Sequence, residues 1–212
     1  MQSNRGVLIV ISGPSGAGKG TICQELLNKN DNIYLSVSAT TRQPRQGEID
    51  GENYYFLKQE EFEERVKNNG FIEYANVHGN YYGTPKLNVE KMLEEGKDVI
   101  LEIDIQGALK VKENFSEGVF IFILPPSMDE LKRRIIKRGS ETEESLMTRF
   151  KNAYQEINYV SKYNYSVVND TLEVAVSKVE AIITAEKCRV DRIKDNTVLD
   201  SKEGLIHEQL YD

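Results

Sequence analysis

The sequence predicts an α/β fold in which a parallel β-sheet is flanked by helices. Short β-branched runs alternate with segments of helical period, a pattern typical of strands connected by helical crossovers. Two of the strand-like runs are almost entirely apolar, as expected for strands buried on both faces. At 212 residues the chain can bury one sizeable core that carries small inserted subdomains.

The expected strands lie at residues 7–12, 99–103, 119–124 and 165–168. A first helix is expected to begin near Lys19, directly after a glycine-rich turn. A later helix is expected where Thr84 provides the N-cap and Pro85 the first helical residue, with Gly96 as the stop.

Two further helices are predicted towards the end of the chain. Ser127 and Glu130 are spaced as a capping box, so a helix is expected to begin there. The last clear helix is expected to begin near Asp170. It carries an apolar stripe of helical period, made of Leu172, Ala175, Val176, Val179, Ile182 and Ile183.

Two stretches interrupt the alternation and predict subdomains. Residues 36–96 are rich in Arg, Tyr and Glu, and residues 133–155 are charged and helical, with Gly139 as an expected hinge. Both are expected to extend from the carboxyl edge of the sheet, where ligands bind in open α/β folds. The core is then expected to comprise residues 1–35, 97–132 and 156–190. Residues 191–212 are expected to form an added helix, a partner contact or a frayed tail.

Composition favours a cytoplasmic enzyme. Hydrophobic residues make up 39% of the chain and charged residues 29%, with a net charge of −7. There is no basic stripe, so no nucleic-acid partner is expected. The apolar run at residues 7–11 is too short for a signal peptide or a membrane span. Two distant cysteines and two histidines favour neither disulfides nor a metal cluster, and Cys23, Cys188, His78 and His207 are expected to be structural or surface residues.

The stretch GPSGAGKGT, at residues 13–21, fits the frame of a phosphate-binding P-loop. A strand is expected before it and a helix after it, so its N–H groups and the helix N-terminus can converge on phosphate oxygens. Lys19 would bridge the outer phosphates of a nucleoside triphosphate. The frame expects Ser or Thr after the lysine to hold magnesium, whereas this chain has Gly20. The metal is then held by Thr21, through water, or from across the site. The alternative is a glycine-rich turn without a ligand.

A second cluster, SATTRQPRQGE at residues 38–48, places Arg42 and Arg45 around a proline turn. Two guanidinium groups held together suit a phosphate monoester, which each can bind with two hydrogen bonds. Alone, this motif would indicate a solvated basic turn. Tyrosines follow at Tyr54 and in GNYYGT at residues 79–84. These tyrosines could equally be core aromatics, and that is the expectation for Tyr55 and Tyr81. Together with the P-loop, the cluster predicts a kinase that acts on a phosphate-bearing acceptor.

At this point the chain resembles the guanylate kinase family over residues 6 to about 188. The matching motifs, in the order of the family, are GPSGAGKGT, SATTRQPRQGE, FIEY at residues 71–74, GNYYGT, LEIDIQG at 101–107, RIIKRG at 134–139 and YSVVND at 165–170. The resemblance implies a P-loop NTPase-type core, a GMP-binding subdomain within 36–96 and a helical lid at 133–155. It also implies transfer of the γ-phosphoryl group of ATP, with Mg²⁺, to GMP or dGMP.

The resemblance further assigns roles to residues of this chain. ATP would be bound by Gly13, Pro14, Ser15, Gly16, Ala17, Gly18, Lys19, Gly20 and Thr21, with Asn169 near adenine. The GMP phosphate would be held by Arg42, Arg45, Tyr54 and Tyr82. Guanine would be addressed by Ser38, Glu73, Thr84 and Asp104. The catalytic set would be Lys19, Arg42, Arg134, Arg138 and Arg149, of which the last three belong to the lid.

The residues themselves support guanine as the base. Guanine presents two adjacent donors, which one carboxylate such as Glu73 can accept, while a hydroxyl can donate to O6. Adenine would leave those buried groups unpaired, which speaks against an AMP or CMP kinase. The alternative is that Glu73 is simply exposed to solvent, as glutamates on strands more commonly are. Glu102 and Asp104 both end a strand, and either can meet guanine or order the waters of magnesium.

The main alternative from another functional class is a non-catalytic guanylate-kinase-like module that binds partner proteins. Such domains lack a working triphosphate cradle. This chain keeps Gly18, Lys19 and the lid arginines, which disfavours that interpretation. The spacing of Arg134 and Arg138 puts both on one face of a helix. Such spacing usually indicates a charged face exposed to solvent. The sequence does not indicate an oligomeric state.

Overall fold

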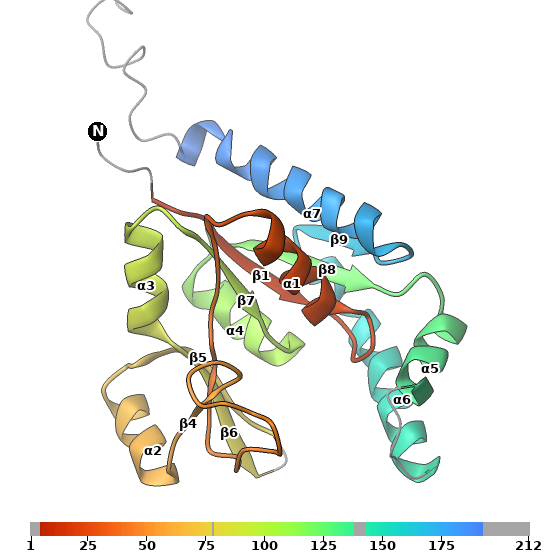
Figure 1. Cartoon of the computed structure of the whole chain (residues 1–212), viewed down its shortest axis with the longest axis horizontal. Helices are drawn as coiled ribbons and strands as arrows, with labels where there is room; N and C mark the ends of the chain where they lie inside the picture. The colour runs from red at the N-terminus through yellow and green to blue at the C-terminus, as the bar shows by residue number, and fades with distance from the viewer. Residues whose placement is uncertain (1–4, 78, 138–142, 193–212) are drawn as a thin grey trace, which may run out of the picture.

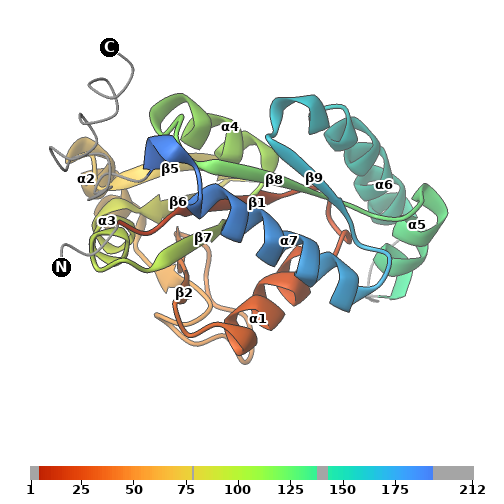
Figure 2. The ribbon, with the colours of Figure 1, turned by 90° about the horizontal axis from the view of Figure 1, so that it is seen from above.

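A computed structural model describes residues 5–77, 79–137 and 143–192. Its centre is a parallel five-stranded sheet of order β2-β7-β1-β8-β9 (Figures 1 and 2). Its strands are β1 (Leu8–Ser12), β2 (Ile33–Leu35), β7 (Asp98–Glu102), β8 (Val119–Leu124) and β9 (Tyr165–Val168). The predicted parallel α/β fold is therefore confirmed.

Helices cover both faces of this sheet. They are α1 (Lys19–Lys29), α3 (Lys86–Glu94), α4 (Ile105–Asn114) and α7 (Leu172–Lys187), and short 3₁₀ turns η1 (Val160–Lys162) and η2 (Val190–Arg192) flank β9 and α7. Alternate residues of β1 separate the two halves of the core. Ile9 and Ile11 pack with α1 and α7, whereas Leu8 and Val10 pack with α3 and α4. The predicted stripe of α7 is confirmed, because all six of its residues belong to or contact the first of these clusters.

A smaller four-stranded sheet of order β4-β3-β6-β5 lies beside the central sheet (Figure 1). It contains β3 (Ala39–Thr40), β4 (Tyr55–Phe56), β5 (Phe71–Val77) and β6 (Asn80–Pro85), with α2 (Gln59–Lys67) packed against it. Phe62 of α2 is fully buried and stacks on Phe71 and Tyr81 at ring distances of 4.4 and 5.3 Å. Tyr81 is thus a packing residue of this small sheet, as the sequence predicted.

The start of α3 differs from the prediction by one residue. Pro85 precedes the helix in an extended conformation, with φ −61° and ψ 120°, and α3 begins at Lys86. Thr84 does not cap the helix, because it belongs to β6 and its hydroxyl donates to the carboxylate of Glu73 at 2.8 Å. The buried carboxylate offers that hydroxyl a stronger, charge-assisted partner than a helix N–H would. The stop at Gly96 is confirmed, with φ 81° just after the last turn.

A pair of helices, α5 (Met128–Lys137) and α6 (Glu143–Ile157), forms a second projection from the central sheet (Figure 1). The Glu130 N–H donates to Ser127 Oγ at 3.1 Å, so the predicted cap of α5 is confirmed. Leu131 and Ile135 of α5 pack against Ala153 of α6. Gly139, the predicted hinge, lies outside the described residues.

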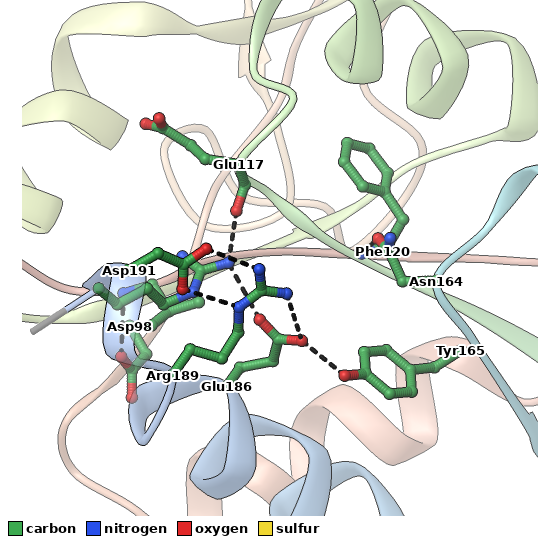
Figure 3. Close-up of polar contacts among 10 residues, drawn as sticks. Asp98, Glu117, Phe120, Asn164, Tyr165, Glu186, Arg189 and Asp191 are labelled. Carbon is green, nitrogen blue, oxygen red and sulfur yellow. Dashed lines mark hydrogen bonds and ion pairs between the residues drawn. The ribbon is translucent and has the colours of Figure 1, made fainter.

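At the amino edge of the central sheet, charged residues fasten the end of α7 (Figure 3). Glu186 is 4% exposed, and its carboxylate accepts hydrogen bonds from Tyr165 Oη at 2.5 Å and from Arg192 at 3.1 Å. Arg192 also donates to the carbonyl of Glu117 at 2.5 Å. This cluster ties β9, α7 and η2 together on the side away from the carboxyl ends of the strands, and it therefore contributes to stability rather than to catalysis.

Replacing Tyr165 by phenylalanine should lower the free energy of unfolding by about 1–2 kcal/mol, because a buried carboxylate loses one of its donors. Thermal unfolding should show a melting temperature lower by about 4 °C, with unchanged kcat. Tyr159→Phe is the control, since Tyr159 is 44% exposed. Equal melting temperatures for Tyr165→Phe and the unmodified protein would show that the Glu186 cluster does not stabilise the fold.

In the part of the chain that the structure describes, no helix combines the length and the apolar character needed to cross a membrane. Cys23 is buried in α1, and burial raises the pKa of its thiol, whereas Cys188 is exposed. Both cysteines are free thiols. His78 and His207 lie outside the described residues.

Candidate active site

The glycine-rich loop joins the carboxyl end of β1 to α1, as the motif predicts. Gly18 occupies the N-cap position of α1 with φ 94°, a left-handed conformation that favours glycine. A Cβ at this position would lie 2.3 Å from Asn169 Nδ2, so the loop also requires glycine for space. Lys19 Nζ donates back to the carbonyls of Gly13, at 2.6 Å, and Pro14, at 3.2 Å. The loop thus curls around its own lysine at a helix N-terminus, the geometry that binds phosphate.

The two carboxylates that end the β7 region point to different neighbours. A Cβ on Gly20 would lie 3.4 Å from Glu102 Oε2, so the Glu102 carboxylate stands against the first turn of α1. Asp104 instead is the N-cap of α4, where its side chain accepts the Gly107 N–H at 2.7 Å. Its charge contributes to raising the pKa of Glu73. The structure therefore separates the two: Glu102 lies on the P-loop side and Asp104 beside Glu73.

Glu73 is the most perturbed carboxylate of the small sheet. It lies on β5, is 8% exposed, and accepts the hydroxyl of the fully buried Thr84 at 2.8 Å. Burial, aided by the charge of Asp104, raises the pKa of Glu73 to about 7, although the Thr84 hydrogen bond and the charge of Lys110 oppose the shift. Buried carboxylates with perturbed pKa values are concentrated at functional sites. Because Glu73 is buried, it is not the simple exposed strand glutamate that the sequence left as the alternative.

Ser38 lies just before β3, half-buried, and its carbonyl accepts the Tyr55 N–H at 2.9 Å. That bond fixes the backbone on which the arginine cluster begins.

The arginine cluster is organised by a carboxylate to which sequence reasoning gave no role. Glu48 accepts two hydrogen bonds from the Arg42 guanidinium, at 2.9 and 3.0 Å, and the Arg45 N–H at 2.7 Å. The Arg42 guanidinium holds the pKa of Glu48 below its usual value. Tyr54 and Tyr82 stand edge to face at 5.9 Å, and the Arg42 guanidinium carbon lies 5.5 Å from the Tyr54 ring centre. The structure thus brings Arg42 and the two tyrosines together, while the Arg45 side chain is exposed.

Two arginines of α5 and α6 contact the P-loop or the asparagine that braces it. Arg149 of α6 donates to Ser15 Oγ at 3.0 Å, and Arg134 of α5 donates to the carbonyl of Asn169 at 3.1 Å. The third predicted lid residue, Arg138, lies outside the described residues. The Asn169 side chain donates to the carbonyl of Ala17 at 2.8 Å, so it braces the loop from the end of β9.

Glu156 of α6 is a further P-loop neighbour that sequence reasoning missed. Burial raises the pKa of its carboxyl group, while Lys19 and the Ser15 N–H oppose that shift. A lone glutamate in a charged helix gives no sequence signal of such a position. Its contact becomes visible only once α6 is placed against the loop.

No group of three or more His, Cys, Asp or Glu side chains within the described ranges is arranged to hold a metal ion. Magnesium commonly keeps several waters and binds through one or two carboxylates plus substrate phosphates. The Glu102 carboxylate against Gly20 fits that mode of binding. Thr21 is exposed on the first turn of α1.

The strand order and the glycine-rich loop between β1 and α1 define a P-loop NTPase fold. The chain belongs to the guanylate kinase family, because the guanylate kinase family model matches residues 5–186. It is similar to the guanylate kinase of Clostridium perfringens (strain SM101 / Type A), with 74% identity over 100% of this chain and 97% of that relative. Its identity to the guanylate kinase of Clostridium tetani (strain Massachusetts / E88) is 72%, over 98% of this chain and 99% of that protein.

A solved structure gives the same result. The crystal structure of guanylate kinase from Anaplasma phagocytophilum superimposes with a TM-score of 0.77 at 38% identity, covering 94% of this chain and 96% of that one. Full-length similarity to proteins named as kinases supports the catalytic interpretation over the non-catalytic binding module.

Proposed function

We propose that the protein transfers the γ-phosphoryl group of ATP to GMP and dGMP, giving ADP and GDP or dGDP. The observation that carries this proposal is the buried pair of Glu73 and Thr84 on the small sheet. The pair lies beside Asp104, which follows β7 at the carboxyl edge of the central sheet, where the P-loop also lies. An ionised Glu73 would accept guanine N1–H and the exocyclic amine. Ser38 would donate to O6, and Asp104 would complete the base site. Thr84 would hold the Glu73 carboxylate in place, because its single hydroxyl proton is donated to Glu73.

Each half of the site would hold one substrate by its phosphates. The P-loop N–H groups and Lys19 would bind the triphosphate, and Arg42, Arg45, Tyr54 and Tyr82 the acceptor phosphate. Because Glu48 already fixes Arg42 and the backbone of Arg45, the acceptor clamp is pre-organised before the substrate arrives. Residues 36–96 would thus form the GMP-binding subdomain.

Arg134 and Arg149 would surround the transferring phosphoryl group, together with Arg138. Positive groups at the equatorial oxygens stabilise a loose transition state without covalent chemistry by the protein. Residues 133–155 would act as a lid that excludes water and so prevents hydrolysis of ATP. We expect Asn169 to approach adenine while it braces the loop.

Glu102 is the residue best placed to order the waters of Mg²⁺, with Thr21 as a second candidate. When bound, Mg²⁺ would neutralise charge on the phosphate oxygens. This assignment leaves Asp104 for guanine. The protein would work in the cytoplasm on small-molecule substrates.

A coupled ADP-release assay across AMP, CMP, UMP, GMP and dGMP tests the proposal. Turnover is expected with GMP and dGMP only, since the other bases lack the two adjacent donors that Glu73 requires. Appreciable activity with AMP would overturn the assignment of the base.

Replacing Arg42 by alanine should raise the GMP KM by about 100-fold, because the phosphate loses a bidentate, charge-assisted partner. The ATP KM should change little. Arg65→Ala is the matched control, since Arg65 forms an exposed ion pair with Glu61 on α2 in the same subdomain. A GMP KM equal to that of the control would remove Arg42 from the phosphate clamp.

A further inference from the structure

We propose that Gly107 is a specificity-determining position of the acceptor site, because the lack of a side chain there leaves the space in which the Glu73 carboxylate meets guanine. The inference rests on the proposed function, since it concerns how the base-binding residues are held. It assigns a role to a residue of α4 that itself offers no functional group.

Gly107 is buried in the first turn of α4, against the two carboxylates of the base site. A Cβ at this position would lie 3.0 Å from Glu73 Oε2 and 3.2 Å from Asp104 Oδ1. Both distances are shorter than the roughly 3.5 Å at which unstrained non-bonded atoms settle. Alanine at position 107 would therefore have to displace one carboxylate or the other.

Either carboxylate can shift only by straining a hydrogen bond. Glu73 Oε1 is held by the hydroxyl of the fully buried Thr84 at 2.8 Å, and Glu73 itself is 8% exposed. Asp104 Oδ1 accepts the Gly107 N–H at 2.7 Å and thereby caps α4. The new methyl group would press on Glu73 Oε2, the oxygen opposite the one that Thr84 occupies. We therefore expect the base-accepting edge of Glu73 to move.

Backbone conformation does not explain this glycine. The glycines with positive φ among the described residues are 13, 16, 18, 47, 51, 79 and 96, whereas Gly107 is a helical residue that is not among them. In a helix, alanine is more favourable than glycine by up to about 1 kcal/mol. Gly107 therefore lowers the stability of α4 without being needed for its backbone conformation. We explain its presence by the space that it leaves beside the carboxylates of Glu73 and Asp104.

The test is Gly107→Ala, with Gln106→Ala as the control because Gln106 is exposed in the same helical turn. We expect the GMP KM to rise at least about tenfold in Gly107→Ala, with kcat and the ATP KM within about threefold of the unmodified enzyme. The melting temperature should stay within about 4 °C of that of the unmodified enzyme, because the gain in helix propensity opposes the strain on the two carboxylates. An unchanged GMP KM would overturn the proposal, as would parallel losses in kcat, both KM values and melting temperature, because those losses would indicate general damage to α4.

A double-mutant cycle decides whether Gly107 acts through Glu73. In a Glu73→Ala background, where the carboxylate is gone, Gly107→Ala should cause no further rise in the GMP KM. A second rise of the same size would contradict the proposal. If the unmodified enzyme fails to phosphorylate GMP at all, the proposed function fails first, and the two failures are thereby distinguished.

Discussion

Replacing Lys19 by methionine is expected to lower kcat by about 10²- to 10³-fold, the usual loss when one pre-organised donor to a developing charge is removed. The lysine would neutralise the outer phosphates as the γ-phosphoryl group leaves. Methionine keeps the unbranched length of the side chain but not its charge. ADP release at saturating ATP and GMP measures the effect.

Lys19 also has a structural role, because its Nζ donates to the carbonyls of Gly13 and Pro14. Its removal could alter the shape of the loop as well as the charge. Two controls separate these causes. Lys29→Met removes an exposed lysine from the last turn of the same helix, where it pairs with Glu180 at 3.8 Å, and should leave kcat unchanged. An equal melting temperature for Lys19→Met would show that the fold is intact. A kcat within threefold of the control would contradict the role of Lys19.

The parts of the fold that sequence predicted well are those with an unambiguous pattern. β8 and β9 have the predicted bounds, because their apolar runs end sharply. β2 was missed since Ile33–Leu35 is only three residues long and lies at the sheet edge. The helix α4 was missed as well. Its first turn contains Gly107, and glycine weakens the helical signal of a sequence.

The site was predictable as a set of residue types but not as a geometry. Glu102 and Asp104 are two residues apart, so a continued strand would place both on one face. In the structure β7 ends at Glu102, and Asp104 becomes the N-cap of α4, which sends the two carboxylates to different neighbours. Glu48 and Glu156 received no role because an isolated glutamate is most often exposed. Their partners, Arg42 and Ser15, become apparent only in three dimensions.

Glu73→Gln is expected to lower kcat/KM for GMP by about 10³-fold or more. A glutamine can accept one donor from guanine, but it would present its own NH₂ to the other, and a base site built on hydrogen bonds discriminates strongly against such mismatches.

Replacing Glu73 by glutamine also removes a charge whose burial is unfavourable. Because the pKa of Glu73 is raised to about 7, its ionised form costs stability increasingly as pH rises from 4.5 through 7. Glu73→Gln should therefore melt at a higher temperature than the unmodified protein at pH 8, and near the same temperature at pH 4.5.

The raised pKa also predicts how GMP binding responds to pH. In the proposed site, guanine would require the carboxylate form of Glu73, which predominates above pH 7 and is lost below it. The GMP KM should be flat above pH 8, rise about fivefold between pH 7 and 6, and approach tenfold per unit below that. The phosphate of GMP itself titrates near pH 6, so the profile is read as a ratio to that of Glu73→Gln, which shares the substrate but not the carboxylate. A ratio that stays constant from pH 8 to pH 5.5 would mean that Glu73 is ionised throughout or does not contact the base.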